Sequence, residues 1–146
     1  MIVSFCGHKE ITEPEKLLPW LEETVEALIQ RGADTFYLGG YGAFDRLAAD
    51  VVWNKKQLYP SVQSILVLPY LDRAVDVTAY DGTIYPPLEK VPRRFAISRR
   101  NEWMVDYSDV IVAYVIHEWG GAATTLRYAT KKKKEVIGWE RSCTSN

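Results

Sequence analysis

The chain has little cysteine and no long apolar run. Its 146 residues include two cysteines, Cys6 and Cys143, which lie near opposite ends and do not form the disulfide framework of a small secreted domain. No apolar run approaches the length of a membrane span, and residues 1–5 are apolar at once, without the basic segment that opens a signal peptide. These absences favour a cytoplasmic location and predict that a membrane is not a partner.

An excess of either charge is also absent. The chain has 18 Lys and Arg against 19 Asp and Glu, and its formal net charge is -1 at pH 7. Proteins that bind nucleic acid through its phosphate backbone usually carry a clear excess of positive charge. We therefore expect that nucleic acid is not a partner.

Repeats, low-complexity tracts and linkers rich in Gly, Ser or Pro are missing as well. The length fits one domain, residues 1–146, and a hydrophobic fraction of 47% is sufficient for a buried core. Cys6 and His8 are close in sequence, but no further Cys or His has the spacing of a metal site. The sequence thus predicts neither a bound metal nor a resident cofactor.

Short apolar runs alternate with amphipathic segments along the whole chain. The runs predict strands over residues 2–6, 35–38, 64–68, 110–115 and 135–138, and the segments between them predict helices over 12–30, 44–56, 95–107 and 124–132. Because the strands are continuous apolar runs, we expect both faces of their sheet to be covered. The predicted fold is an α/β three-layer sandwich with a mainly parallel five-stranded sheet, Rossmann-like in character.

Two local features shape these expectations. Thr12 and Glu15 have the spacing of a capping box, which places the start of the first helix at Thr12. Residues 70–92 hold several prolines and acidic residues and are expected to be irregular. That segment is either a functional loop at the carboxyl end of the third strand or a meandering surface loop, and both interpretations stay open.

Glycine-rich breaks follow three of the expected strands and each opens a helix. They are Gly7-His8, the run 39–45 and the run 120–124. A helix start leaves backbone N–H groups free and carries partial positive charge, so a glycine-rich loop at that point favours a bound anion. The pattern predicts a ligand that bears phosphate, in a pocket at the carboxyl ends of the strands.

Particular side chains complete this candidate site. The Arg100 guanidinium suits a phosphate oxygen, Trp119 is placed to stack on a base, and Asp45 either bonds a ribose or favours its helix dipole. His8 either lines the pocket or is an ordinary loop histidine, and Arg100 is alternatively part of a solvated basic face. No catalytic residue is assigned. The predicted ligand-binding residues are Gly7, His8, Gly39, Gly40, Tyr41, Gly42, Phe44, Asp45, Arg100, Trp119, Gly120, Gly121, Ala122 and Thr124.

Three further tryptophans lie on the expected amphipathic helices. Trp20, Trp53 and Trp103 belong either to the core or to an interface between copies. Large aromatic residues are enriched in interface cores, and two-fold dimers are the commonest oligomers. We therefore expect a homodimer.

The motifs together resemble the SLOG superfamily. Phe5-Cys6-Gly7-His8 and the loop 39–45 are similar to the F-x-G-H and G-G-x-x-x-F-D segments of small bacterial and phage members of unknown function. The superfamily includes the Lonely Guy phosphoribohydrolases and the DNA-processing protein A family, and the likeness runs from Ile2 to Ile137. It implies a Rossmann-like, nucleotide-binding domain.

The chain departs from the hydrolases of that superfamily at their catalytic position. Arg100 falls on the arginine of their R-K-x-x-M motif, but Asn101 replaces the lysine. In P-G-G-x-G-T-x-x-E, Trp119 replaces the proline and Arg127 replaces the catalytic glutamate. The resemblance therefore implies a phosphate cradle without phosphoribohydrolase activity.

The expected function is that of a cytoplasmic protein that senses or sequesters a nucleotide or an ADP-ribose-like derivative. One alternative is an N-glycosidic-bond hydrolase or transferase that uses a non-standard acid. The candidates for that acid are Asp45, Asp72, Asp81 and Glu118. A nucleic-acid-associated module is a third possibility, disfavoured by the balanced charge.

Overall fold

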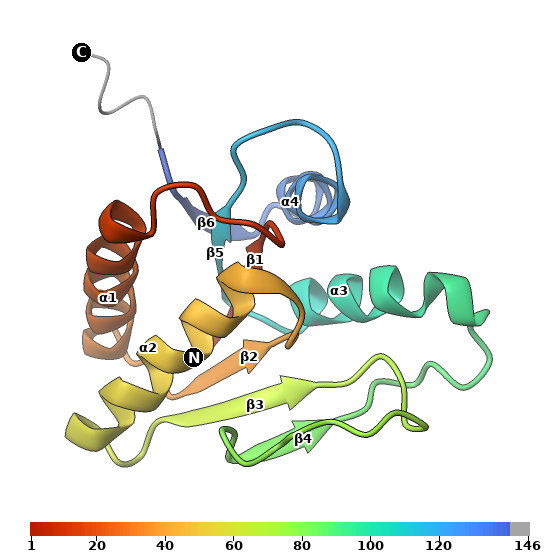
Figure 1. Ribbon diagram of the computed structural model, residues 1–146, viewed down its shortest axis with the longest axis horizontal. Helices are drawn as coiled ribbons and strands as arrows, with labels where there is room; N and C mark the ends of the chain where they lie inside the picture. Colours follow the sequence, from red (N-terminus) through yellow and green to blue (C-terminus); the bar gives the residue numbers. More distant parts are fainter. Residues whose placement is uncertain (141–146) are drawn as a thin grey trace.

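The computed structural model describes residues 1–140 and contains one six-stranded sheet (Figure 1). The strands are β1 (Ile2–Gly7), β2 (Thr35–Leu38), β3 (Gln63–Val67), β4 (Gly82–Ile84), β5 (Val110–Tyr114) and β6 (Glu135–Gly138). Their order is β4-β3-β2-β1-β5-β6, and every neighbouring pair is parallel. The α/β fold with a parallel, Rossmann-like sheet is confirmed.

Helices cover the two faces of this sheet as pairs. They are α1 (Pro14–Gln30), α2 (Gly42–Leu58), α3 (Ala96–Asp106), preceded by the short 3-10 helix η1 (Arg93–Phe95), and α4 (Gly121–Lys131). Figure 1 shows α1 beside α2 on one face and α3 beside α4 on the other. The sheet is therefore the middle layer of a three-layer sandwich.

Successive residues of β1 show why its apolar run serves both layers. Val3 and Phe5 pack in the core beneath α1 and α2, while Cys6 packs with Val105 and Ile111 beneath α3 and α4. Alternate side chains of a strand point to opposite faces, so a strand covered on both sides needs apolar residues at nearly every position.

The prediction of five strands was one strand short. The sixth strand, β4, lies inside the segment 70–92 that was expected to be irregular. Asp81 fixes its start, because the backbone N–H of Asp81 donates to the Ser64 carbonyl at 2.8 Å and the Asp81 carboxylate accepts from the Ser64 N–H at 2.8 Å. Lys56 also pairs with this carboxylate. A strand of 3 residues held by such contacts has no hydrophobic pattern of its own.

The predicted capping box of the first helix was wrong. The helix begins at Pro14, and the N-cap residue before it, Glu13, makes no side-chain hydrogen bond to the first turn. The hydroxyl of Thr12 instead lies 3.3 Å from the hydroxyl of Tyr114, and the Thr12 N–H donates to the same hydroxyl at 3.2 Å. Pro14 has no N–H to satisfy, and the N–H groups of Lys16 and Leu17 donate to the Glu13 carbonyl at 3.0 and 2.9 Å, so the helix begins without the box.

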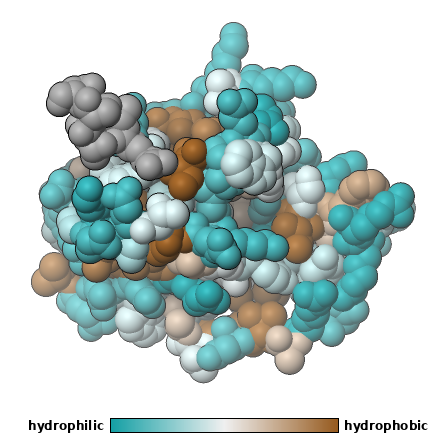
Figure 2. Space-filling model, turned by 45° about the horizontal axis from the view of Figure 1, so that its top comes forward, coloured by the Kyte–Doolittle hydropathy of each residue, from teal (hydrophilic) through white to brown (hydrophobic). Residues whose placement is uncertain are grey.

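The tryptophans of the helices make contacts within the chain. Trp20 packs against Trp139 with ring centroids 5.6 Å apart, and Trp103 lies 5.6 Å from the ring of Tyr37. Trp53 is 38% exposed. On the face shown in Figure 2, apolar patches are small and separated by hydrophilic side chains. The homodimer stays a prediction.

Two other expectations concern the two cysteines and a membrane. Cys143 lies outside the described residues, and Cys6 is buried within them. Across residues 1–140, none of the helices is long and apolar enough to cross a membrane.

Candidate functional site

The sheet topology brings the three glycine-rich loops to one edge. From β1 the chain proceeds outward to β2, β3 and β4, and then returns to place β5 on the other side of β1. In sheets of this kind ligands bind outside the carboxyl ends of the strands, where the strand order reverses. Because β1, β2 and β5 are parallel neighbours, the loops that follow them meet at this point.

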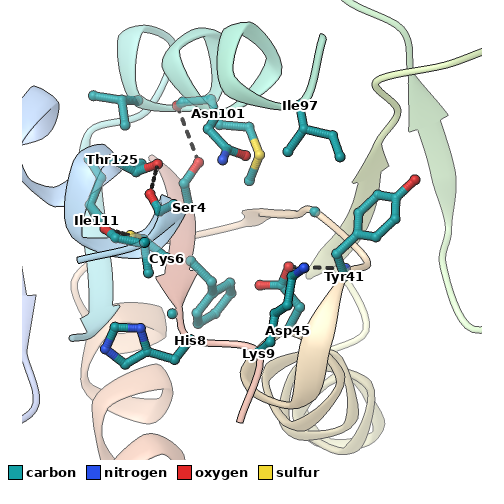
Figure 3. A pocket seen from close by; sticks show the side chains of 18 of the residues that line it. Ser4, Cys6, His8, Lys9, Tyr41, Asp45, Ile97, Asn101, Ile111 and Thr125 are labelled. Atoms are coloured by element: carbon teal, nitrogen blue, oxygen red, sulfur yellow. Dashed lines mark hydrogen bonds between the residues drawn. The ribbon is translucent and has the colours of Figure 1, made fainter. Parts of the chain in front are cut away.

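A cavity of about 710 Å³ opens at the same edge. Figure 3 shows Asp45 and Tyr41 on one side of it, His8 on another, and Ile97 and Asn101 projecting from α3. Ten of the predicted ligand-binding residues line it: Gly7, His8, Gly39, Tyr41, Asp45, Arg100, Trp119, Gly120, Gly121 and Ala122.

Four predicted residues do not line this cavity. Phe44 is fully buried beneath Gly7 and stacks on Tyr114, with ring centroids 5.7 Å apart. Gly42 lies against the backbone of Lys9, and Gly40 borders a separate cavity of about 220 Å³. The fourth is Thr124, whose hydroxyl donates to the Gly120 carbonyl at 3.1 Å.

Several lining residues were not predicted. Polar ones include Lys9 after β1, Asn101 on α3 and Thr125 on α4, and the apolar wall includes Met104 and Ile97. Thr125 takes the place expected for Thr124 because α4 begins at Gly121 rather than at Thr124. Residues 121–124 are therefore helical instead of a loop, and neighbouring residues of a helix point about 100° apart, so Thr124 and Thr125 face different directions.

The start of α4 presents unpartnered backbone donors. Gly120 precedes the helix at φ 94°, a conformation that side-chain-bearing residues rarely adopt. Within the described residues, the N–H groups of Gly121, Ala122 and Ala123 donate to no acceptor. The first turn also contains no acidic side chain. Free N–H groups and the positive end of the helix dipole together favour an anion here.

Arg100 is 2% exposed, and two of its three side-chain nitrogens donate hydrogen bonds within the chain. Its Nη1 donates to the carbonyl of Gly39 at 2.9 Å and to the carbonyl of Val67 at 2.6 Å, and its Nε donates to Asn101 Oδ1 at 2.9 Å. Its Nη2 makes no hydrogen bond within the described residues. The side chain therefore connects α3 to the ends of β2 and β3 and leaves Nη2 without an acceptor among the described residues.

Asp45 is the buried acid of the cavity. Its Oδ2 accepts a hydrogen bond from the Tyr41 N–H at 3.2 Å. Burial raises the pKa of this carboxyl to about 6, and the attraction of Arg100 opposes that rise. Burial thus moves the titration of this carboxyl group toward neutral pH.

His8 lies in the cavity wall in a defined protonation state. Its Nε2 accepts a hydrogen bond from the Ile116 N–H at 2.9 Å, so the single proton of the neutral ring sits on Nδ1. Burial lowers the pKa of His8, and the neighbouring His117 lowers it further. The neutral ring stacks on His117, and His117 stacks on Trp119, each pair with centroids 3.8 Å apart. Trp119 ends the stack and is 70% exposed, with its outer face uncovered by another ring.

The Arg127 side chain of α4 is engaged away from the cavity. Arg127 donates to the Glu118 carbonyl at 3.0 Å and to the Thr124 hydroxyl at 3.2 Å, and it does not line the cavity.

Across residues 1–140, no group of three His, Cys, Asp or Glu side chains is placed to hold a metal ion.

Solved structures share this fold. DNA processing protein A from Helicobacter pylori, described with a single-stranded DNA binding mode, superimposes with a TM-score of 0.68 at 18% identity, over 97% of this chain and 66% of its own. DNA processing protein A from Streptococcus pneumoniae gives 0.66 at 14% identity, over 93% and 49%. The molybdenum cofactor carrier protein from Chlamydomonas reinhardtii gives 0.59 at 21% identity, over 94% and 75%.

These likenesses show the fold. The chain has a Rossmann-like fold, and it spans about two thirds of one DNA processing protein A and about half of the other. No family model matches the chain, and no curated protein does so either. One structural relative is described with a single-stranded DNA binding mode, and another is named as a carrier of the molybdenum cofactor.

Proposed function

We propose that the protein binds a nucleotide or an ADP-ribose-like derivative, with a ligand phosphate at the start of α4, and that it senses or sequesters this ligand. The observation that carries the proposal is the set of three unpartnered N–H groups of Gly121, Ala122 and Ala123 at the start of α4, where Gly121 and Ala122 line a cavity of about 710 Å³. Trp119 supports it, since its exposed ring offers a stacking surface beside the same helix start.

A pair of variants at Gly121 tests the phosphate site. Proline is tolerated at the first position of a helix but lacks the N–H, so Gly121→Pro removes one donor while the helix is kept. We expect the affinity for nucleoside monophosphates to fall roughly tenfold, the effect of one hydrogen bond to a charged group. Isothermal titration calorimetry with adenosine and guanosine 5'-monophosphates measures this change.

The matched control is Gly121→Ala, which retains the N–H and whose added methyl group has no atom within 4 Å. It is expected to bind as the unaltered protein does. Equal loss in both variants would contradict the phosphate site. Binding of a thymidine oligonucleotide, with no binding of any mononucleotide, would favour the single-stranded DNA interaction described for the Helicobacter pylori relative.

The protein is expected to lack phosphoribohydrolase activity. Arg127 stands where the resemblance places the catalytic glutamate, and its guanidinium is engaged with Glu118 and Thr124. A cation there opposes the positive charge that develops on ribose as the base departs. Incubation with adenosine 5'-monophosphate, followed by chromatography, should show no free adenine beyond a protein-free control.

Asp45 is the observation that favours the second candidate function, an N-glycosidic-bond hydrolase or transferase. It lines the cavity, and burial raises its pKa to about 6, which suits a general acid near neutral pH. Release of adenine that disappears in Asp45→Asn would therefore replace the binding function with this one.

A further inference from the structure

The two ends of the cavity differ in the chemistry they offer. The α4 end presents free backbone N–H groups, and none of the lining residues of α4 carries a charged side chain, so this end suits an anion. The β2 end presents a carboxylate, Asp45, beside a guanidinium, Arg100. A phosphate at the β2 end would meet the repulsion of Asp45 as well as the attraction of Arg100, so this end suits an uncharged group that both donates and accepts hydrogen bonds.

Gly39 allows the two charged groups to lie together. A Cβ at this position would stand 3.0 Å from Asp45 Oδ2 and 3.1 Å from Arg100 Nη2. The side chain of any other residue would intrude between carboxylate and guanidinium. Both groups are more than nine-tenths buried, Asp45 at 9% exposure and Arg100 at 2%, so the surrounding protein fixes their positions.

Each of the two groups keeps unused hydrogen-bonding capacity. Asp45 Oδ2 accepts one bond, from Tyr41, and Oδ1 accepts none within the described residues. Arg100 uses Nη1 and Nε, while the two hydrogens of Nη2 have no acceptor there. The β2 end therefore offers two acceptor oxygens and, next to them, one donor nitrogen.

We propose that Asp45 and Arg100 bind the base of the ligand and select guanine, a 2-amino-6-oxopurine, over adenine. The proposal rests on the proposed function, with the phosphate at α4. The N1–H and 2-amino groups of guanine donate to the Asp45 carboxylate, and its O6 accepts from Arg100 Nη2. Adenine carries a single amino donor and places its unprotonated N1 beside it, so it leaves one carboxylate oxygen facing a lone pair.

Calorimetry on the unaltered protein at pH 7.5 tests the selection with four probes that share a 5'-phosphate. They are guanosine, inosine and adenosine 5'-monophosphates and ribose 5-phosphate. We expect guanosine monophosphate to bind about tenfold or more tightly than adenosine monophosphate, with inosine monophosphate between them because it lacks the 2-amino group.

The outcomes separate this proposal from the one on which it rests. Equal binding of all four probes would overturn the selection while leaving the phosphate site in place, and so would tighter binding of adenosine monophosphate. Absence of binding by every probe would overturn both proposals.

Substitution of Asp45 provides a change of preference that a structural role cannot produce. Asparagine has the shape of aspartate but offers one donor and one acceptor, which match adenine. Asp45→Asn is therefore expected to reverse the order, so that adenosine monophosphate binds more tightly than guanosine monophosphate. The control is Asp50→Asn, an exposed position of the same helix, which should keep the original order.

A thermal melting curve establishes that each variant is folded. A folded Asp45→Asn protein that still prefers guanosine monophosphate would overturn the assignment. Should this variant fail to fold, the comparison of guanosine with inosine monophosphate on the unaltered protein decides the proposal.

Discussion

Gly7→Ala is expected to destabilise the protein by about 1–3 kcal/mol, the usual cost of adding a methyl group to a filled core. The added Cβ would stand 2.2 Å from Phe44 Cδ2 and 2.7 Å from Phe44 Cβ. Phe44 cannot retreat easily, because its ring is fully buried between Phe5 and Tyr114. Urea denaturation followed by circular dichroism measures the loss.

Gly121→Ala serves as the control for this substitution also. The same methyl group is added, but its position has no atom within 4 Å. Its free energy of unfolding should stay within about 0.5 kcal/mol of the unaltered protein, as for most surface changes. Equal stability of the two variants would show that Phe44 does not restrict residue 7.

Gly7 also shows what the sequence pattern could and could not reveal. A glycine directly after a buried strand indicates a close approach to the backbone, and the sequence predicts that a ligand makes this approach. The structure places the buried ring of Phe44, from α2, against Gly7, and Gly7 also lines the cavity.

The sheet was largely predictable because parallel strands covered on both faces need continuous apolar runs. Five such runs are visible, and the position of the glycine-rich loops at one edge follows from the parallel arrangement. The exception, β4, is held by Asp81 and Lys56, which are contacts between distant segments and leave no local signal.

The details of the site depended on the same kind of long-range contact. Thr12 contacts the Tyr114 hydroxyl, more than a hundred residues away in sequence, instead of capping α1. The start of α4 decides that Thr125 rather than Thr124 faces the cavity. Neither arrangement can be predicted from the residue types or spacing near Thr12 and Thr125.

Arg100 shows the limit of reasoning from a resemblance. The matching motif assigns it a ligand role, and one of its nitrogens remains available for that role. The structure adds a second role, because Nη1 satisfies the carbonyls of Gly39 and Val67 at the ends of two strands. A loss of binding in an Arg100 variant therefore needs a stability measurement beside it.

Arg100→Ala is expected to lower the free energy of unfolding by about 2–4 kcal/mol, because two buried carbonyl groups lose their donor at about 1–3 kcal/mol each. Water entering from the cavity recovers part of that cost, which keeps the loss below the largest sum. Arg99→Ala is the matched control, since Arg99 is the preceding residue of α3 and is exposed. Its effect should stay within about 0.5 kcal/mol.

Urea denaturation of the three proteins without ligand isolates the structural role of Arg100 from its role in binding. The Arg100→Ala protein should unfold at a clearly lower urea concentration than the Arg99→Ala protein, with a similar dependence on denaturant. If the two variants unfold together, the bonds to Gly39 and Val67 do not stabilise the fold. The role of Arg100 would then be confined to the ligand. The change in affinity of the Arg100→Ala protein would report that role without a correction for stability.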